Sequence, residues 1–142
     1  MIRELMIINQ SGIALFYHSF INNENVDDEQ SLASYFDIIC KFTKRSFRES
    51  LRTITLDSFI FFFYTHSSRY HLVLKCDKIE IDNELLESIS ETIIEEFLDL
   101  YKDVLINFNG EISNFHSFSE ILINLIDFKT KDRKNYLPPL KP

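Results

Sequence analysis

The side chains in this sequence that could act as metal ligands or nucleophiles are four histidines and two cysteines. In chain order they are His18, Cys40, His66, His71, Cys76 and His116. Zinc sites usually bring their ligands together through short local patterns such as CxxC and HxxxH. Neither pattern occurs here, so the sequence predicts no metal site, and we expect these side chains to pack as ordinary residues.

A thiol beside an imidazole is the arrangement of a nucleophilic pair, and Cys40 with His18 is one candidate. Cys40, however, follows Ile38 and Ile39 in a stretch with helical periodicity, where a thiol usually packs as a small hydrophobic group. His18 and His71 both fall in predicted strands and are candidate neighbours across a sheet, but packing is again the simpler interpretation. We therefore predict no enzyme, no catalytic residue and no cofactor.

Carboxylates repeat along one predicted helix, where Glu91 and Glu95 lie one turn apart, as general acid–base partners would. The stripe consists of Glu84, Glu87, Glu91, Glu95, Asp99 and Asp103. No apolar pocket is implied around it, so a solvated helix face is the simpler interpretation. A docking surface for a basic partner is the functional alternative.

Positive charge gathers at one place in a chain whose net charge is −7, from 15 basic and 22 acidic residues. The basic cluster consists of Lys41, Lys44, Arg45, Arg48 and Arg52. Part of it compensates the negative pole of a helix dipole and contributes to solubility. The functional alternative is contact with an acidic partner or with anionic lipid head groups. The acidic balance of the whole chain disfavours a nucleic-acid-binding protein.

Length and composition indicate one globular domain, because the chain has 142 residues of which 45% are hydrophobic. Its two glycines, Gly12 and Gly110, are too few for a glycine-rich loop that cradles phosphate. We find no secretory signal and no apolar stretch of 18 residues, and there are two cysteines. We expect a soluble cytoplasmic protein, with peripheral contact at membranes as an open alternative.

Hydrophobic periodicity predicts the elements that position these side chains. In chain order they are strands over 3–10 and 13–20 joined by a turn at Ser11-Gly12, a helix over 29–47 capped by Asp27 or Asp28, strands over 51–57, 59–65 and 69–76, and helices over about 83–107 and 113–127. The apolar face of the first helix is expected to consist of Leu32, Tyr35, Phe36, Ile39, Phe42 and Phe47.

The arrangement of these elements follows from which strands have apolar faces that helices must shield from solvent. Residues 51–57 alternate between apolar and polar types, which is typical of a half-exposed strand near a sheet edge. Residues 59–65 are apolar on both faces, which places them in the sheet centre with cover above and below. We therefore predict an α+β fold with a five-stranded, mainly antiparallel sheet in the order ββαβββαα, one helix on one face and two on the other.

The end of the chain differs in composition from the rest. Residues 129–142 carry five basic residues and one acidic residue, and Pro138-Pro139 cannot continue a helix. We divide the chain into a domain over 1–128 and a basic, proline-containing flexible tail over 129–142. A weak contact between the tail and an anionic membrane surface is one functional interpretation.

This order of elements resembles that of the longin domain, within the wider profilin-like group of folds. The matching features span residues 1 to about 128. They are a strand that starts almost at Met1, the Ser11-Gly12 turn, the helix with Tyr35-Phe36, the strands from Leu51 to Lys75, and the paired terminal helices. Roadblock domains are similar but normally begin with a helix, whereas the first predicted strand here starts at residue 3.

The resemblance implies a non-enzymatic interaction module, a scaffold or subunit in small-GTPase regulation and membrane trafficking. Nothing after Lys129 matches the coiled coil of the longin SNAREs, so a stand-alone member similar to sedlin, to other TRAPP subunits or to adaptor small chains is favoured. The partner it implies is a small GTPase or another longin or roadblock-type protein, in a homo- or heterodimer. Which GTPase and which oligomer are left open.

In the longin family, peptide segments bind in the groove between the first helix and the third strand. Here that groove would be lined by parts of residues 32–47 and 51–57, with Ile54 at the strand edge. Strand 13–20 would be the opposite edge, where Phe16 is a second candidate because its aromatic residues cannot all face one side. The alternative function is a profilin-like small-ligand sensor or a cryptic enzyme, in which the 14 phenylalanines line an apolar pocket.

Overall fold

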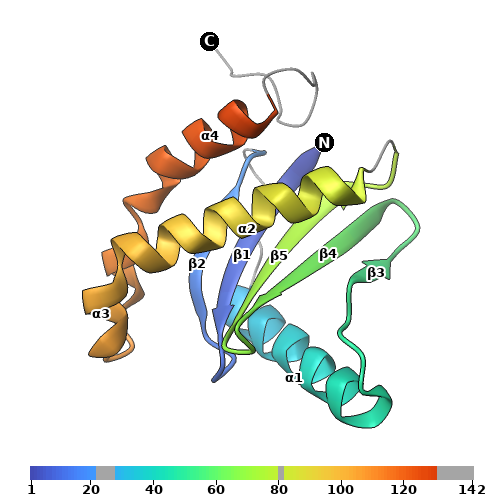
Figure 1. The fold of residues 1–142 in the computed structure, drawn as a ribbon, viewed down its shortest axis with the longest axis horizontal. Coiled ribbons are helices and arrows are strands. Elements are labelled where there is room, and N and C mark those ends of the chain that lie inside the picture. Colours follow the sequence, from blue (N-terminus) through green and yellow to red (C-terminus); the bar gives the residue numbers. More distant parts are fainter. Residues whose placement is uncertain (22–27, 80–81, 131–142) are drawn as a thin grey trace.

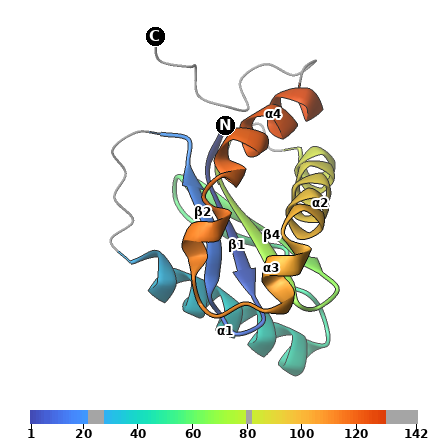
Figure 2. The same cartoon turned by 90° about the vertical axis from the view of Figure 1, so that its left-hand side faces the viewer.

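The computed structural model describes residues 1–21, 28–79 and 82–130 of the chain. In these ranges, five strands form an antiparallel sheet in the spatial order β2-β1-β5-β4-β3. The elements are β1 (Ile2–Asn9), β2 (Ala14–Ser19), α1 (Glu29–Phe47), β3 (Thr53–Thr55), β4 (Phe59–His66), β5 (Tyr70–Asp77), α2 (Asn83–Leu100), α3 (Lys102–Ile106), the 3₁₀ helix η1 (Ile112–Phe115) and α4 (Phe118–Lys129). Helix α1 covers one face of the sheet, and α2 and α4 lie over the other (Figures 1 and 2). The predicted α+β fold and order of elements are confirmed.

The turn between β1 and β2 requires a glycine. Gly12 has a φ of 79°, which side chains with a Cβ rarely adopt, and a Cβ there would lie 3.4 Å from Asp37 Oδ2 on α1. Asn9 shapes the same turn, since its side-chain oxygen accepts hydrogen bonds from the backbone N–H groups of Ser11 and Ile13, both at 3.0 Å. The hairpin therefore approaches the middle of α1 at van der Waals distance.

Helix α1 begins and ends where its sequence predicts. The Asp28 carboxylate accepts a hydrogen bond from the Ser31 N–H at 3.0 Å, which satisfies one of the free donors of the first turn. Arg48 ends the helix in the left-handed conformation, with a φ of 60°. Of the two predicted caps, Asp28 is the one in place, and Asp27 lies outside the described residues.

The sheet separates two cores of unequal size. The larger lies under α2 and α4, where neighbouring rings among Phe97, Tyr101, Phe115 and Phe118 have their centres 5.1–6.1 Å apart. The smaller lies under α1 and includes Met6, Phe36, Phe63 and Val73. Most of the buried apolar volume is therefore on the α2 and α4 side.

Two predicted helix boundaries are wrong, and the aromatic cluster of the larger core explains both. The predicted helix over 83–107 breaks at Tyr101, whose side chain is buried and whose hydroxyl lies 2.8 Å from Ser117 Oγ. The predicted helix over 113–127 begins at Phe118, after the turn η1. Packing of Tyr101 against Phe97 and Phe115 fixes a bend that helical periodicity alone does not signal.

The sheet differs from the prediction in two details. Strands β2 and β3 are the edges, as predicted, but regular pairing in the third strand is limited to Thr53–Thr55. The central strand is β5, and β4 lies between it and the edge. Phe62 and Phe63 of β4 are buried, whereas Phe59 and Phe61 are only half-buried, so the predicted cover on both faces of this strand is incomplete.

The predicted apolar face of α1 is wrong in part. Helix α1 turns Ala33, Phe36, Asp37 and Cys40 toward the sheet. Three residues of the predicted face remain in contact with solvent, with exposed fractions of 54% for Tyr35, 60% for Phe42 and 66% for Phe47. The apolar stripe on this helix is wider than the area that the sheet can cover, so part of it stays on the surface.

The described part of the chain ends at residue 130, directly after α4. The helix includes Lys129, and residues 131–142 lie outside the described ranges, so the division into a domain over 1–128 and a tail over 129–142 stays a prediction. Within residues 1–21, 28–79 and 82–130, no helix combines the length and the hydrophobicity that crossing a lipid bilayer requires.

Candidate functional site

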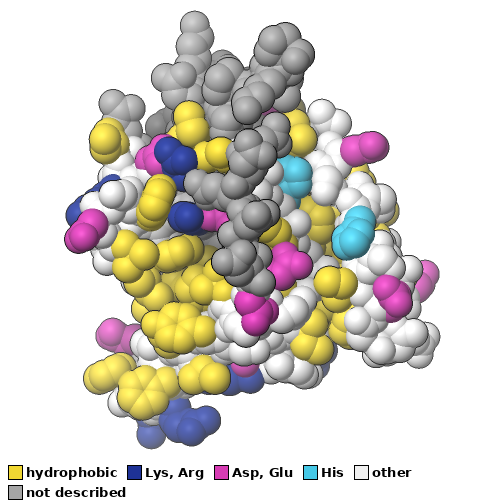
Figure 3. All heavy atoms as spheres, turned by 180° about the vertical axis from the view of Figure 1, so that it is seen from behind, with side chains coloured by type: hydrophobic (Ala, Val, Ile, Leu, Met, Phe, Trp, Pro, Cys, Tyr) yellow, Lys and Arg dark blue, Asp and Glu magenta, His cyan; other side chains and the backbone are white. Residues whose placement is uncertain are grey.

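An apolar groove runs between α1 and the β3 side of the sheet. Figure 3 views the molecule from the side opposite to Figure 1 and shows hydrophobic side chains gathered on one part of this face. The partly buried lining of the groove includes Leu32 of α1, Ile54 of β3 and Phe61 of β4, and Tyr35 and Phe42 lie exposed on the solvent side of α1 beside them. Every one of these side chains is half-buried or exposed, although all are apolar or aromatic. We call this surface the apolar groove.

The floor of the groove joins the helix to the sheet through aromatic contacts. The Phe36 ring lies 5.1 Å from the Phe61 ring and 5.2 Å from the Phe63 ring, and the Tyr35 ring lies 5.9 Å from that of Phe36. A small cavity of about 100 Å³, bordered by Leu32, Phe36 and Phe61, continues the groove toward Lys75. The exposed rings are thus held in place by buried ones.

The outer edge of β3 borders the groove. The Phe63 N–H donates to the Arg52 carbonyl and the Leu56 N–H donates to the Phe59 carbonyl, both at 2.8 Å. Because backbone bonding alternates along an antiparallel strand, residues 52, 54 and 56 bond toward β4. Thr53 and Thr55 therefore direct their backbone N–H and C=O groups away from the sheet, where an added strand would meet them.

One end of the groove is held by an ion pair beneath it. Glu4 is buried, its Oε2 lies 2.9 Å from Lys75 Nζ, and it accepts a hydrogen bond from the Tyr17 hydroxyl. The Lys75 ammonium lies 4.4 Å from the centre of the Phe59 ring, which is a cation–π distance. Burial and the Glu4 carboxylate together raise the pKa of Tyr17, so its phenol stays protonated and keeps donating.

The predicted basic cluster lies along the second half of α1 and in the segment that follows it. Lys41 and Lys44 turn to the flank of α1 away from the groove, and both line a separate cavity. Arg45, Arg48 and Arg52 are exposed at the C-terminal end of α1 and before β3. Lys41 and Arg45 lie one turn apart on α1 and are therefore neighbours on its surface, so a partner-binding role for the cluster stays a prediction.

The two predicted edge residues differ in position. Ile54 is half-buried and lies in the apolar groove, where the sequence placed it. The expectation of exposed aromatic surface at Phe16 is wrong: its side chain is 2% exposed and its ring lies 5.3 Å from that of Phe118. The aromatic side chains of β2 alternate as predicted, but α4 and the larger core cover the face that carries Phe16.

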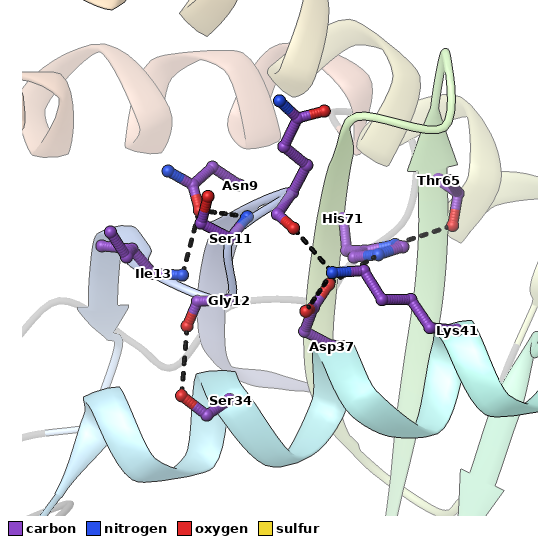
Figure 4. Close-up of polar contacts among 10 residues, drawn as sticks. Asn9, Ser11, Gly12, Ile13, Ser34, Asp37, Lys41, Thr65 and His71 are labelled. Carbon is purple, nitrogen blue, oxygen red and sulfur yellow. Dashed lines mark hydrogen bonds and ion pairs between the residues drawn. The ribbon is translucent and has the colours of Figure 1, made fainter.

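A buried polar cluster lies on the other flank of α1 (Figure 4). Asp37 and His71 are 4% and 7% exposed, and His71 Nε2 lies 3.6 Å from Asp37 Oδ1. Lys41 Nζ lies 2.8 Å from the other carboxylate oxygen of Asp37, and the Thr65 hydroxyl lies 2.9 Å from His71 Nδ1. Burial lowers the pKa of His71 and the nearby Asp37 carboxylate opposes that shift only in part, so the imidazole is neutral at pH 7.

The histidines and cysteines are not arranged for nucleophilic or metal chemistry. His18 and His71 are not neighbours, because His18 pairs with Leu5 and His71 with Ile8, on opposite faces of the sheet. Burial raises the pKa of Cys40 to about 11 and that of Cys76 to about 12, so both are neutral thiols. Among the described residues, no group of three or more histidine, cysteine or carboxylate side chains is placed to hold a metal ion.

Sequence reasoning missed the aromatic residues of β4 and the polar role of Asp37. Phe59 and Phe61 are predicted as core because they stand in an apolar run. Asp37 interrupts the side of α1 that carries Ala33 and Cys40, and a carboxylate at such a position signals a buried polar partner. The same pattern shows that Tyr35 and Phe42 lie on a different side of the helix from the residues that pack.

Comparisons with known proteins relate this chain to others through structure. No protein-family model matches it, and no curated protein matches it in sequence. The Roadblock/LC7 domain from Streptomyces avermitilis is similar in structure, with a TM-score of 0.52 and 16% identity over 70% of this chain and 84% of that one.

Two further structures are similar with lower TM-scores. The gliding protein MglB from Thermus thermophilus has a TM-score of 0.47 and 14% identity, over 54% of this chain and 62% of that one. MglB from Myxococcus xanthus has a TM-score of 0.49 and 15% identity, over 64% and 85%. From the Streptomyces match we conclude that this chain has a roadblock-like fold.

Proposed function

We propose that this chain is a non-enzymatic protein-interaction module, a scaffold or subunit in small-GTPase regulation and membrane trafficking. One observation carries the proposal. The apolar groove exposes apolar side chains from three elements beside the outer edge of β3, which pairs with no further strand in the part of the chain that the structure describes. The roadblock-like fold supports the class of function, and the groove supports the surface at which it acts.

The groove has the composition of an interface. Tyr35 and Phe42 are more than half exposed, and removing the exposed part of such a side chain from water contributes about 1–2 kcal/mol to a complex. A contiguous apolar patch on one face of a domain typically marks a site where another molecule binds. Aromatic side chains held by buried neighbours, as Tyr35 is by Phe36, lose little conformational entropy on binding.

The outer backbone edge of β3 indicates how a partner would bind. An extended segment that pairs with Thr53 and Thr55 would extend the sheet, and its side chains would reach Ile54 and Phe61 across the groove. Arg45, Arg48 and Arg52 at the end of α1 favour acidic residues at one end of that segment. The backbone would supply affinity, and the aromatic and basic side chains would supply specificity.

The partner we propose is a small GTPase or another longin or roadblock-type protein, in a homo- or heterodimer. We further propose that the chain is a member of the longin type, acting in the cytoplasm with peripheral contact at membranes. The order of elements from β1 to α4 supports the first point. The basic residues near the end of α1 support the second.

Charge substitutions in the groove test the proposal. Phe42→Glu and Ile54→Lys each place a charge on the groove while leaving the buried residues of α1 and β4 unchanged. Phe128→Glu is the matched control, because Phe128 is 67% exposed, close to the 60% of Phe42, and lies on α4 across the sheet. Sedimentation equilibrium measures self-association, and a panel of purified small GTPases in both nucleotide states measures partner binding.

The wild-type chain and Phe128→Glu should associate or bind, and the two groove variants should lose at least tenfold in affinity, as expected for a central aromatic anchor. A chain that stays monomeric and binds no GTPase contradicts the proposed function. Groove variants that bind as well as Phe128→Glu contradict the proposed surface.

A further inference from the structure

A polar cavity of about 300 Å³ opens on the flank of α1 opposite the apolar groove. Four chain segments meet around it: the second half of α1, the turn between β1 and β2, the turn between β4 and β5, and the connection from α1 to β3. We call it the turn cavity. Its lining includes Lys41, Lys44, Ser67 and Ser68, with Asp37 and His71 at its base.

The charge of the turn cavity is opposite in sign to that of the whole chain. It contains two lysines and one carboxylate, and Lys41 pairs with that carboxylate at 2.8 Å. Lys44, three residues further along α1, has no side-chain hydrogen bond or ion pair within residues 1–21, 28–79 and 82–130. The cavity therefore offers a net positive charge in a chain whose net charge is −7.

The lysine that is already paired still has a donor to offer. Lys41 Nζ donates to Asp37 Oδ2 at 2.8 Å and to the Gln10 carbonyl at 2.7 Å (Figure 4). An ammonium group has three N–H donors, so one remains for a ligand. Because two bonds fix its position, Lys41 would meet a ligand without further ordering of its side chain.

Hydroxyl groups supply further donors at the opening. Ser67 and Ser68 are the two central residues of the turn from His66 to Arg69 between β4 and β5, closed by a hydrogen bond of 3.0 Å from the Arg69 N–H to the His66 carbonyl. Their φ angles are 52° and 59°, values that glycine and asparagine adopt more readily than serine. Both serines line the turn cavity together with the two lysines.

The base of the turn cavity is polar and preformed. His71 and Asp37 are both more than nine-tenths buried, and Lys41 Nζ lies 2.8 Å from Asp37 Oδ2, so the charge of this carboxylate is balanced within the cavity and that of Lys44 is left over. Thr65 Oγ1 lies 2.9 Å from His71 Nδ1, which fixes the ring. With its cations and hydroxyl donors, such a cavity suits a small polar anion better than an apolar ligand.

We propose that the turn cavity binds the phosphate group of a small phosphomonoester, held by Lys41 and Lys44 and by the hydroxyls of Ser67 and Ser68. The volume accommodates a phosphate with a small organic substituent. Charge-assisted hydrogen bonds from ammonium groups are the strongest contacts available to it. The proposal is independent of the apolar groove, which lies on the other flank of α1.

Titration of the full chain with inorganic phosphate and with glycerol phosphate, at constant ionic strength, tests this proposal by ¹⁵N–¹H NMR. Saturable shifts are expected at the amides of Lys41, Lys44, Ser67 and Ser68. Lys44→Gln should weaken binding about tenfold, because it removes one charge-assisted contact. Lys102→Gln, at an exposed lysine on α3, is the matched control and should leave the affinity unchanged.

A second arm identifies the source of the phosphate. Vesicles of phosphatidylcholine with and without phosphatidic acid present the same phosphomonoester on a lipid. Binding to the soluble phosphates supports a free ligand, and Lys44-dependent binding to the phosphatidic acid vesicles alone assigns the phosphate to a lipid head group. Absence of saturable binding in both arms overturns the proposal, as does equal weakening by Lys44→Gln and Lys102→Gln. Phe42→Glu, in the apolar groove, should bind phosphate as the wild-type chain does.

Discussion

The two flanks of α1 differ in chemistry: one is apolar and the other is polar. On one flank, Leu32 packs against the smaller core together with Ile54 and Phe61, and Tyr35 and Phe42 extend this apolar surface onto the solvent side of the helix. On the other, Asp37 and Lys41 form a polar network with the first hairpin and β5, and the result is the turn cavity. One helix of 19 residues thus presents two surfaces of different chemistry.

The difference shows that the two flanks of this helix contribute differently to stability, because the residues of one flank are exposed to solvent and key residues of the other are buried. The groove residues contact solvent, so their loss removes little from the folded state. The residues of the turn cavity connect three elements while Asp37 and His71 are almost fully buried. We expect substitutions on the cavity flank to affect folding and those on the groove flank to affect binding.

Asp37→Ala should have the largest effect on stability. It leaves the Lys41 ammonium without its ion-pair partner and removes the carboxylate that faces His71. Because Asp37 is buried but Lys41 is half exposed, the expected loss in the free energy of unfolding is about 2–3 kcal/mol, below the full range for a buried pair. Urea unfolding followed by circular dichroism measures it.

The groove flank provides the contrast for that measurement. Tyr35→Ala, two positions away on α1, should change the free energy of unfolding by less than about 0.5 kcal/mol, since its side chain is 54% exposed. A loss for Tyr35→Ala equal to that for Asp37→Ala would show that the two flanks do not differ in the way we describe.

Gly12→Ala should have the next largest effect, because the hairpin turn contacts the cavity flank of α1. A residue with a Cβ at a φ of 79° costs about 1–2 kcal/mol. The contact of 3.4 Å between that Cβ and Asp37 Oδ2 adds to the cost. Gly110→Ala is the matched control: Gly110 also has a positive φ, 94°, but no atom lies within 4 Å of its Cβ position. Thermal unfolding should show a larger decrease in Tm for Gly12→Ala, and equal decreases would mean that the turn does not press on α1.

The dependence of stability on pH should also distinguish the two flanks. Burial lowers the pKa of His71 below its unfolded value of 6.5, so the unfolded chain binds a proton more readily than the folded one. Stability is therefore constant above pH 6.5 as far as this group is concerned, and it falls as the pH drops from 6.5 to the folded pKa. Asp37, Lys41 and Thr65 are the charged and polar groups that face the ring.

His71→Gln should reduce this loss, measured as the free energy of unfolding in urea between pH 7.5 and 5 relative to the wild-type chain. The pKa of His18 on β2 is also lowered by burial, so His18→Gln is the comparison and accounts for the remaining slope. If His71→Gln leaves the slope unchanged, the imidazole does not titrate in the way its burial indicates.

The smallest effect is expected when the native chain is treated with thiol reagents, because neither cysteine should react. Burial raises the pKa of Cys40 to about 11 and that of Cys76 to about 12, so very little thiolate is present at pH 7. Both thiols should react with a disulfide reagent only after unfolding in urea, as absorbance of the released thiol would show. Rapid reaction of Cys40 alone in the native state would mean that the turn cavity admits the reagent to the interior.

The sequence predicted the fold because its elements are locally consistent. The periodicity over 29–47, the Asp28 cap and the Ser11-Gly12 turn each depend on near neighbours, and each is confirmed. The break at Tyr101 depends on Phe115 and Ser117, which are distant in sequence, and no local signal announces it.

The candidate sites were predicted less well for the same reason. Ile54 and the groove between α1 and β3 follow from an edge strand next to an amphipathic helix, which the sequence does show. The burial of Phe16 depends on α4, and the burial of Asp37 beside His71 depends on β5, and both of these elements are distant in sequence. Helical periodicity specifies which residues share a face but not how wide a band the neighbouring layer will cover.

The unequal division of the interior between the two faces has a consequence for how this molecule can change over generations. The densely packed aromatic layer around Phe97 and Phe118 holds the sheet without help from the outer surface of α1. Replacements along that outer surface can alter what the protein recognises while the layer that keeps it folded stays intact. The architecture thus leaves recognition open to selection and confines the strictest packing constraints to the opposite side.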